Sequence, residues 1–212
     1  PVWCAYALSF FWILTLINAF NLIDVMDGLA TTVAMCAAIP FLGVAICEGN
    51  HAVVLLLICF FGALCAFLTH NFPPASMYLG DAGSMLIGGV LGVLPLNVYP
   101  HTIHAYLSYG IILAIPLIEL ITLIVVRTYK GIPFYKGSPD HYSLYLLGNG
   151  WTKKNILIYT SCLMCFLVIV STLFLVEQIT IVHTCVLAFL FITVWLSLIM
   201  VPPACLKKRV IH

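Results

Sequence analysis

The sequence has 212 residues, of which 64% are hydrophobic and 7% are charged, and its formal net charge is +1. So small a net charge, without a basic stripe, excludes the charge balance of a nucleic-acid-binding protein. So few charges in so apolar a chain also exclude an ordinary soluble domain and indicate a protein embedded in a membrane.

Apolar stretches of about twenty residues indicate transmembrane helices, because only a helix satisfies its own backbone within ~30 Å of hydrocarbon. The sequence predicts about seven spans, at residues 2–22, 29–47, 52–70, 84–98, 105–126, 156–176 and 180–201. The fourth is short and ends near Pro95, so we expect a tilted or shielded helix there. Residues 1–212 are therefore predicted to form a single domain, an all-α polytopic membrane bundle. Because a span begins directly after Pro1, we expect the chain to be the C-terminal part of a longer protein.

The basic residues are confined to two segments, which sets the expected topology. They are Arg127, Lys130, Lys136, Lys153 and Lys154 in the loop after the fifth span, and Lys207, Lys208 and Arg209 in the tail. Two intervening spans place both segments on one side, and the positive-inside rule makes that side cytoplasmic. Counting spans backwards puts residues 23–28 and 71–84 on the same face.

A polar stripe ends the first span. Asn18, Asn21, Asp24 and Asp27 recur every third residue, so on a continuing helix they share one face. Amide and carboxylate oxygens form a hard surface suited to Mg²⁺ and to the hydroxyl or amide groups of a ligand. The alternative is a helix end that emerges into water, with Gly28 as its C-cap.

A second polar segment separates the third and fourth spans. Pro73 and Pro74 end one helix, and the next is expected to begin at Ser84, shortly after Gly80 and Asp81. Free backbone N–H groups at that helix start, beside a carboxylate, suit a phosphate and a metal ion. The alternative is an ordinary N-cap by Ser84 or Asp81.

The third polar segment is the loop 127–154, with Lys130, Asp140 and His141 among glycines and prolines. Its lysines, Lys153 and Lys154 in particular, have the alternative interpretation of topology markers attracted to lipid headgroups. Glu119 lies roughly 12 Å deep at 1.5 Å per residue. We expect its carboxylate to be protonated, paired or facing a polar cavity.

Two of these segments resemble motifs of one enzyme family. Residues 18–29 resemble the N-A-x-N-x-x-D-G-x-D-G-L segment of the polyprenyl-phosphate N-acetylhexosamine-1-phosphate transferases (glycosyltransferase family 4). Residues 71–84 resemble that family's N-x-x-P-A-x-x-F-M-G-D-x-G-S loop. The motifs occur in the family's order, and the resemblance covers nearly all of the chain.

The sequence departs from the family in the third segment. The pattern D-R-x-H-x-H-H is replaced by D-H-Y-S-L-Y-L from Asp140, which keeps one histidine. This departure favours the WecA-like branch over the MraY type, whose loop carries a histidine triplet. Val25 replaces a family glycine, and the family's Asp-Asp pair on an earlier cytoplasmic loop is absent, as expected for a C-terminal part.

The resemblance implies a catalytic domain that transfers a sugar 1-phosphate, most simply GlcNAc-1-phosphate, from a UDP-sugar to polyprenyl (undecaprenyl) phosphate. UMP would leave, and the reaction would take place at the cytoplasmic face of the cell membrane during synthesis of cell-envelope polysaccharide. It implies Mg²⁺, with Mn²⁺ as an alternative, and Asp81 as the metal ligand.

The implied catalytic residues are Asp24, Asp27 and Asp81. The implied substrate-binding residues are Asn18, Asn21, Asn71, Gly80, Ser84, Lys130, Asp140 and His141. A homodimer is left open. Two alternatives use the same polar residues: a membrane transporter, which would hold them near the midplane, and an inactive structural subunit.

Overall fold

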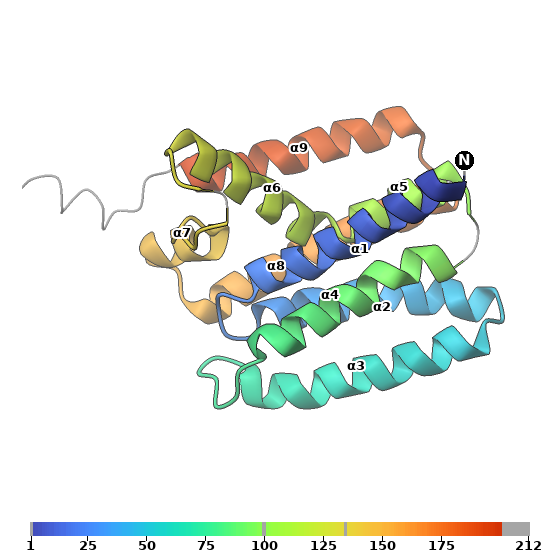
Figure 1. Ribbon diagram of the computed structural model, residues 1–212, viewed down its shortest axis with the longest axis horizontal. Helices are drawn as coiled ribbons and strands as arrows, with labels where there is room; N and C mark the ends of the chain where they lie inside the picture. Colours follow the sequence, from blue (N-terminus) through green and yellow to red (C-terminus); the bar gives the residue numbers. More distant parts are fainter. Residues whose placement is uncertain (1, 99–100, 134, 201–212) are drawn as a thin grey trace, which may run out of the picture.

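The computed structural model describes residues 2–98, 101–133 and 135–200, with side chains as far as Ser197. Pro1, the tail cluster Lys207 to Arg209 and His212 lie outside the described residues. Within them the chain is helical and has no strand (Figure 1). The helices are α1 (Val2–Ile23), α2 (Leu29–Cys47), α3 (His51–Asn71), α4 (Gly80–Asn97), α5 (Ile103–Ile112), α6 (Ala114–Tyr129), α7 (Tyr142–Gly148), α8 (Lys153–Leu175) and α9 (Ile181–Met200).

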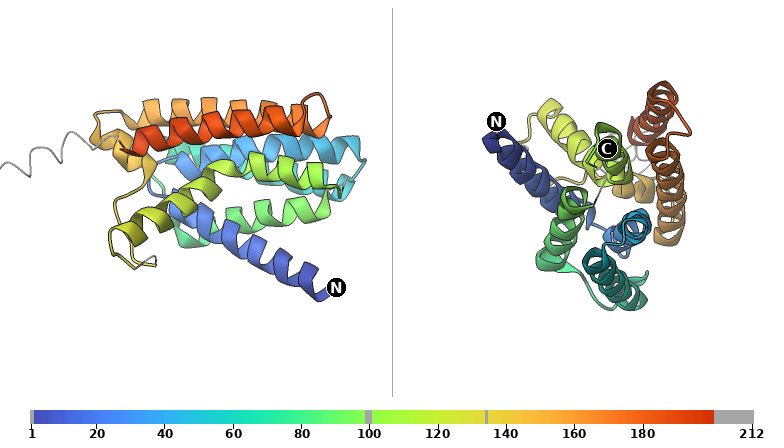
Figure 2. Two further views of the ribbon diagram at one scale, coloured as in Figure 1. Left: turned by 90° about the horizontal axis from the view of Figure 1, so that it is seen from above. Right: turned by 90° about the vertical axis from the view of Figure 1, so that its right-hand side faces the viewer.

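The long helices lie side by side and run up and down between two ends of the bundle (Figure 1). Helix α2 is central, in contact with α1, α3, α4 and α8, as the end-on view of Figure 2 shows. It is apolar around its whole circumference, which is the pattern of a helix buried on all sides. Its small residues, such as Ala34, Ala37 and Ala38, let the neighbouring helices approach closely.

Membrane-length helices follow the predicted spans closely. By length and composition α1, α2, α3 and α8 are candidate spans, and α5 with α6 forms a fifth that is bent by 72°. Helices α4 and α9 complete the seven expected elements but are shorter or less apolar. The structure therefore confirms a polytopic helical bundle, with four or five clear spans among the described residues.

The span expected over 105–126 corresponds to the bent pair α5 and α6, because the chain breaks at Leu113. Pro116 lies in the first turn of α6, where its missing N–H costs nothing, whereas it could not continue a helix arriving from α5. The break turns α6 away from α5 and toward the end of α1, against which it packs. Helix α7, which the sequence did not predict, follows in the loop.

Close contact between α1 and α4 brings two of the polar segments together. A Cβ atom on Gly88 would lie 2.5 Å from the Leu16 carbonyl oxygen, so glycine alone fits this crossing. The C-terminus of α1 thereby meets the N-terminus of α4. The starts of α2 and α8, the end of α6 and the whole of α7 lie at this same end of the bundle (Figure 1).

Candidate active site

Helix α1 ends at Ile23, so Asp24 and Asp27 lie in the turn after it and do not continue one helix face with the asparagines. Asn21, near the end of α1, meets the second motif directly. Asn21 Nδ2 donates to Asp81 Oδ1 (3.1 Å) and to Ser84 Oγ (3.2 Å), which lie 60 and 63 residues away in sequence. Helix α4 begins at Gly80, four residues earlier than expected, so Asp81 lies in its first turn. Ser84 is buried inside the helix, and its hydroxyl donates to the Gly80 carbonyl (3.1 Å). The N-cap interpretation of Ser84 is therefore wrong.

Five of the expected site residues line one cavity of about 270 Å³ at this end of the bundle. They are Asp24, Asp27, Asn71, Gly80 and Asp81. Gly80 has a φ of 65°, a left-handed conformation that favours glycine and lets the chain turn into α4 at the cavity wall. Polar groups from the first and second polar segments thus converge on a space large enough for several ligand atoms.

Asp24 is under electrostatic strain in this cavity. Burial, and then the negative charge of Asp81, raise the pKa of Asp24 to about 6. Two neighbouring carboxylates repel one another unless a proton or a cation lies between them.

The same two carboxylates are of the ligand type that Mg²⁺, the ion implied by the resemblance, usually takes. No cluster of three or more His, Cys, Asp or Glu side chains exists within the described residues. Mg²⁺ is usually bound by one or two carboxylates together with substrate phosphates and water, and does not require such a cluster. Asp24 and Asp81 therefore fit the ion.

The raised pKa of Asp24 predicts a pH-dependent stability. Its folded value of about 6 exceeds the ordinary 3.8, so the contribution of Asp24 to stability is fully present below pH 4 and is lost as pH rises through 6. In metal-free buffer, we expect the wild type to lose melting temperature relative to Asp24→Asn over this range. Asp27→Asn is the matched control, because the pKa of Asp27 is lowered and its contribution is instead lost toward acid. Parallel melting temperatures of wild type and Asp24→Asn from pH 4 to 7 would contradict the shift.

Asp27 differs from Asp24 because it is already paired. Its Oδ2 accepts from Lys153 Nζ (2.8 Å) and from the Ala75 backbone N–H (3.3 Å). Burial raises the pKa of Asp27, but the hydrogen bonds and the charge of Lys153 outweigh burial and leave the pKa lowered. Asp27 is therefore a fixed, ionised carboxylate and a poor candidate for a base.

Lys153 is the residue that sequence reasoning missed. It lies in the first turn of α8, and its place in the cytoplasmic loop fits a topology marker as well as a site residue. A signal was present, because a lysine in the first helical turn opposes the helix dipole and a carboxylate is expected there instead. A partner from another segment explains the exception.

Asn71 is buried and joins two loops. Its Oδ1 accepts from the Gly28 N–H (2.9 Å) and from Thr31 Oγ1 (3.3 Å), while its Nδ2 donates to the Met77 carbonyl (2.8 Å). These bonds hold the α1–α2 turn against the α3–α4 loop. The structure thus gives Asn71 a clear structural task, and its substrate-binding role stays a prediction.

A second space lies on the other side of the α1 terminus. A groove of about 360 Å³ runs between α1 and α6, with apolar walls that include Phe11 and Ile124. Asn18, Asn21 and Arg127 line it as well, and give it polar groups. Asn21 therefore lines the groove and is hydrogen-bonded to Asp81, which lines the acidic cavity.

The third expected motif forms its own cluster. Lys130 pairs with Asp140, which also accepts from Tyr145 Oη (3.1 Å). Burial raises the pKa of Asp140, but the hydrogen bonds from Lys130 and its other partners outweigh burial and leave the pKa below its usual value. His141 is 5% exposed, and its Nδ1 lies 3.1 Å from Glu119 Oε1.

Glu119 is paired, as expected, and also accepts from the Tyr142 N–H (3.2 Å). It fixes His141 and the start of α7 to α6. Lys130 and Asp140 thus pair with each other and His141 pairs with Glu119, whereas the cavity is lined by residues of the other two motifs.

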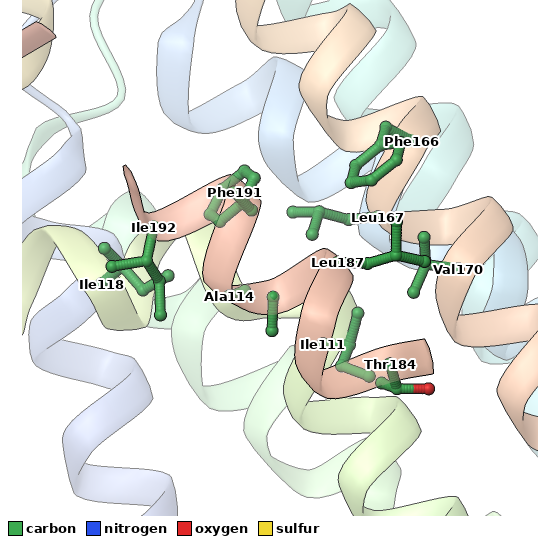
Figure 3. Close-up of a pocket in the computed structure, with 11 residues that line it drawn as sticks. Ile111, Ala114, Ile118, Phe166, Leu167, Val170, Thr184, Leu187, Phe191 and Ile192 are labelled. Atoms are coloured by element: carbon green, nitrogen blue, oxygen red, sulfur yellow. The ribbon is translucent and has the colours of Figure 1, made fainter. Parts of the chain in front are cut away.

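The pockets elsewhere in the described residues are lined mainly by apolar side chains. One of them lies between α5, α6, α8 and α9. It encloses about 60 Å³, and Figure 3 shows side chains such as Leu167 and Phe191 closing around it. Thr184 is the one polar side chain among the residues that line it, so it offers a charged ligand little to bind. The acidic cavity is therefore the candidate site.

Comparison with known proteins finds one family model that matches the part of the chain lining this cavity. The model of the family described as "Glycosyl transferase family 4" matches residues 1–99, which include α1, α4 and both motifs of the cavity. The chain belongs to this family.

Its relatives carry two different names. A phospho-N-acetylmuramoyl-pentapeptide-transferase of Kosmotoga olearia is 35% identical over 156 residues, which is 73% of this chain and 46% of the relative. That of Lactobacillus johnsonii is 30% identical over 146 residues, 69% of this chain and 44% of the relative. A probable undecaprenyl-phosphate N-acetylglucosaminyl 1-phosphate transferase of Bacillus subtilis is 29% identical over 163 residues, 74% and 45% of the two chains. The chain spans about half the length of these relatives.

Proposed function

We propose that the protein transfers a sugar 1-phosphate from a UDP-sugar to a polyprenyl phosphate at the cytoplasmic face of the cell membrane. The observation that carries the proposal is the cavity that Asp24 and Asp81 line together, with Asn21 donating a hydrogen bond to Asp81. Family membership supports the same chemistry. A transporter would hold such residues at the bilayer midplane, whereas these lie at one end of the bundle (Figure 1).

In the proposed reaction, a lipid phosphate oxygen forms a bond to the phosphorus that carries the sugar. The bond from that phosphorus to the bridging oxygen breaks, and UMP leaves with the electron pair. When bound, Mg²⁺ would supply positive charge to the phosphates of both substrates. Asp24 and Asp81 would hold it, and Asn21 orients Asp81 through its amide.

The apolar groove suits the lipid substrate. It lies between α1 and α6 and is lined mostly by apolar side chains, and Asn21 connects its polar residues to the acidic cavity. A polyprenyl chain in the groove would place its phosphate beside Arg127 and Asn18. The nucleotide sugar would then occupy the cavity on the other side of α1.

We propose a UDP-N-acetylhexosamine, most simply UDP-GlcNAc, as the donor. The third motif keeps one histidine, and that imidazole is buried against Glu119. A large donor with a charged peptide needs more contacts than this compact loop offers. A small sugar needs only contacts to its diphosphate and hydrogen bonds to a few of its hydroxyl groups. The relatives bear names of both types, so the donor has to be tested directly.

One assay on the full-length protein tests both parts of the proposal. With polyprenyl phosphate and Mg²⁺, we expect UMP release from UDP-GlcNAc, and a slower release from UDP-MurNAc-pentapeptide in competition. No UMP release from any UDP-sugar would refute the proposed reaction. Faster turnover of UDP-MurNAc-pentapeptide than of every UDP-N-acetylhexosamine would leave the reaction intact but overturn the donor.

A further inference from the structure

The cavity presents an electrostatic problem for the substrate that the proposed function assigns to it. Asp24, Asp27 and Asp81 all line it, and each can carry a negative charge. A nucleotide diphosphate is itself anionic, so its entry requires compensating positive charge close to the acids. A cation between Asp24 and Asp81 would compensate for those two only, and Asp27 needs another source.

Lys153 supplies positive charge at Asp27. Its Nζ lies 2.8 Å from Asp27 Oδ2, although the two residues are 126 positions apart in sequence. An ammonium group has three N–H donors, and this contact uses one of them. The lysine side chain is 45% exposed while that of Asp27 is 12% exposed, so a solvent-exposed lysine contacts a carboxylate that lines the cavity.

Two features set the position of Lys153 apart from that of an ordinary surface ion pair. Asp27 is held from the other side by the Ala75 N–H, which fixes the carboxylate that orients the ammonium. Lys153 also lies in the first turn of α8, where the helix dipole disfavours a cation. A half-exposed pair contributes little to stability, so stability alone gives a weak reason for a lysine at this site.

The neighbouring lysine provides a contrast. Lys154 follows in the same helical turn, but its Nζ lies 5.7 Å from the ring centroid of Phe72, as in a cation–π contact. The two ammonium groups therefore point to different partners: one to the cavity carboxylate and one to an exposed aromatic ring.

We propose that Lys153 is a binding residue for the diphosphate of the nucleotide sugar, held at the rim of the cavity by Asp27. The proposal rests on the proposed function and extends it to a residue of α8. The lipid phosphate is assigned to the groove beyond Asn21, so Lys153 serves the nucleotide substrate and not the lipid.

The test compares Lys153→Met with Lys154→Met in the full-length protein. Loss of a charged hydrogen bond to a phosphate should raise KM for the UDP-sugar about 10- to 100-fold in Lys153→Met. KM for polyprenyl phosphate should change less than about twofold, and Lys153→Arg should recover most of the loss because it keeps the charge. Lys154→Met should resemble the wild type in both constants.

KM separates this role from a structural one, because KM does not depend on the amount of folded enzyme. A loss in Lys153→Met confined to the apparent kcat would overturn the proposal, as would equal KM values in the two lysine variants. UDP binding, measured by calorimetry without turnover, tests the role of Lys153 separately from the proposed function. Absence of UMP release in the wild type would refute the reaction, whereas equal UDP affinity of wild type and Lys153→Met would refute the role of Lys153.

Discussion

Asp81→Asn should remove most of the activity of the full-length protein while leaving its fold intact. The substitution is nearly isosteric, and the amide oxygen of asparagine can still accept the hydrogen bond from Asn21. What disappears is the negative charge that faces Asp24 and would hold a divalent cation. Because metal stabilisation of a phosphoryl-transfer transition state amounts to several kcal/mol, we expect a fall of about 10²- to 10³-fold in kcat.

UMP release at saturating substrates measures this effect, with the melting temperature in detergent as the check on folding. Glu177→Gln is the matched control, since it makes the same chemical change in a carboxylate beside His104 at the other end of the bundle. It should leave turnover unchanged. Wild-type turnover by Asp81→Asn at low Mg²⁺ would remove Asp81 from the role of metal ligand.

The helices were predictable because the bilayer sets their length. The first three helices end within a few residues of the predicted bounds, since the apolar runs are interrupted by Gly28, Asn50 and the Pro73–Pro74 pair. The break at Leu113 was missed because the run from 105 to 126 is apolar at nearly every position, Glu119 being the main exception. In that run the backbone effect of Pro116 outweighs the hydropathy.

The site was predictable as a set of residues but not as a set of contacts. The first motif supplied Asn21 and Asp24, although α1 ends at Ile23 and the two residues share no helix face, and the second motif supplied Asp81. The pairing of Asn21 with Asp81 depends on how two helices cross, which no local pattern specifies. The same holds for the pairs Lys153–Asp27 and Glu119–His141, each of which joins segments that only tertiary packing brings together.

Gly88→Ala should disrupt that packing and so test whether the α1–α4 crossing builds the site. The added Cβ would lie 2.5 Å from the Leu16 carbonyl oxygen and 2.7 Å from Ile17 Cα. Both are backbone atoms, so no change of rotamer relieves the clash and α4 has to move away from α1. Overpacking of this kind costs about 1–3 kcal/mol, and we expect a lower melting temperature.

Activity should fall further than stability, because the displacement lies seven residues from Asp81 on the same rigid helix. A shift of about 1 Å in a catalytic group can cost about 10²-fold in rate, so UMP release per folded molecule should fall by that order. Gly89→Ala is the matched control: its Cβ would meet nothing closer than Ile17 Cγ1 at 3.9 Å, an ordinary contact. Equal melting temperatures and equal turnover in the two alanine variants would mean that the close approach at Gly88 does not position Asp81. An inactive Gly88→Ala protein beside a fully active Gly89→Ala protein would instead tie the chemistry of the cavity to a single glycine of the helix crossing.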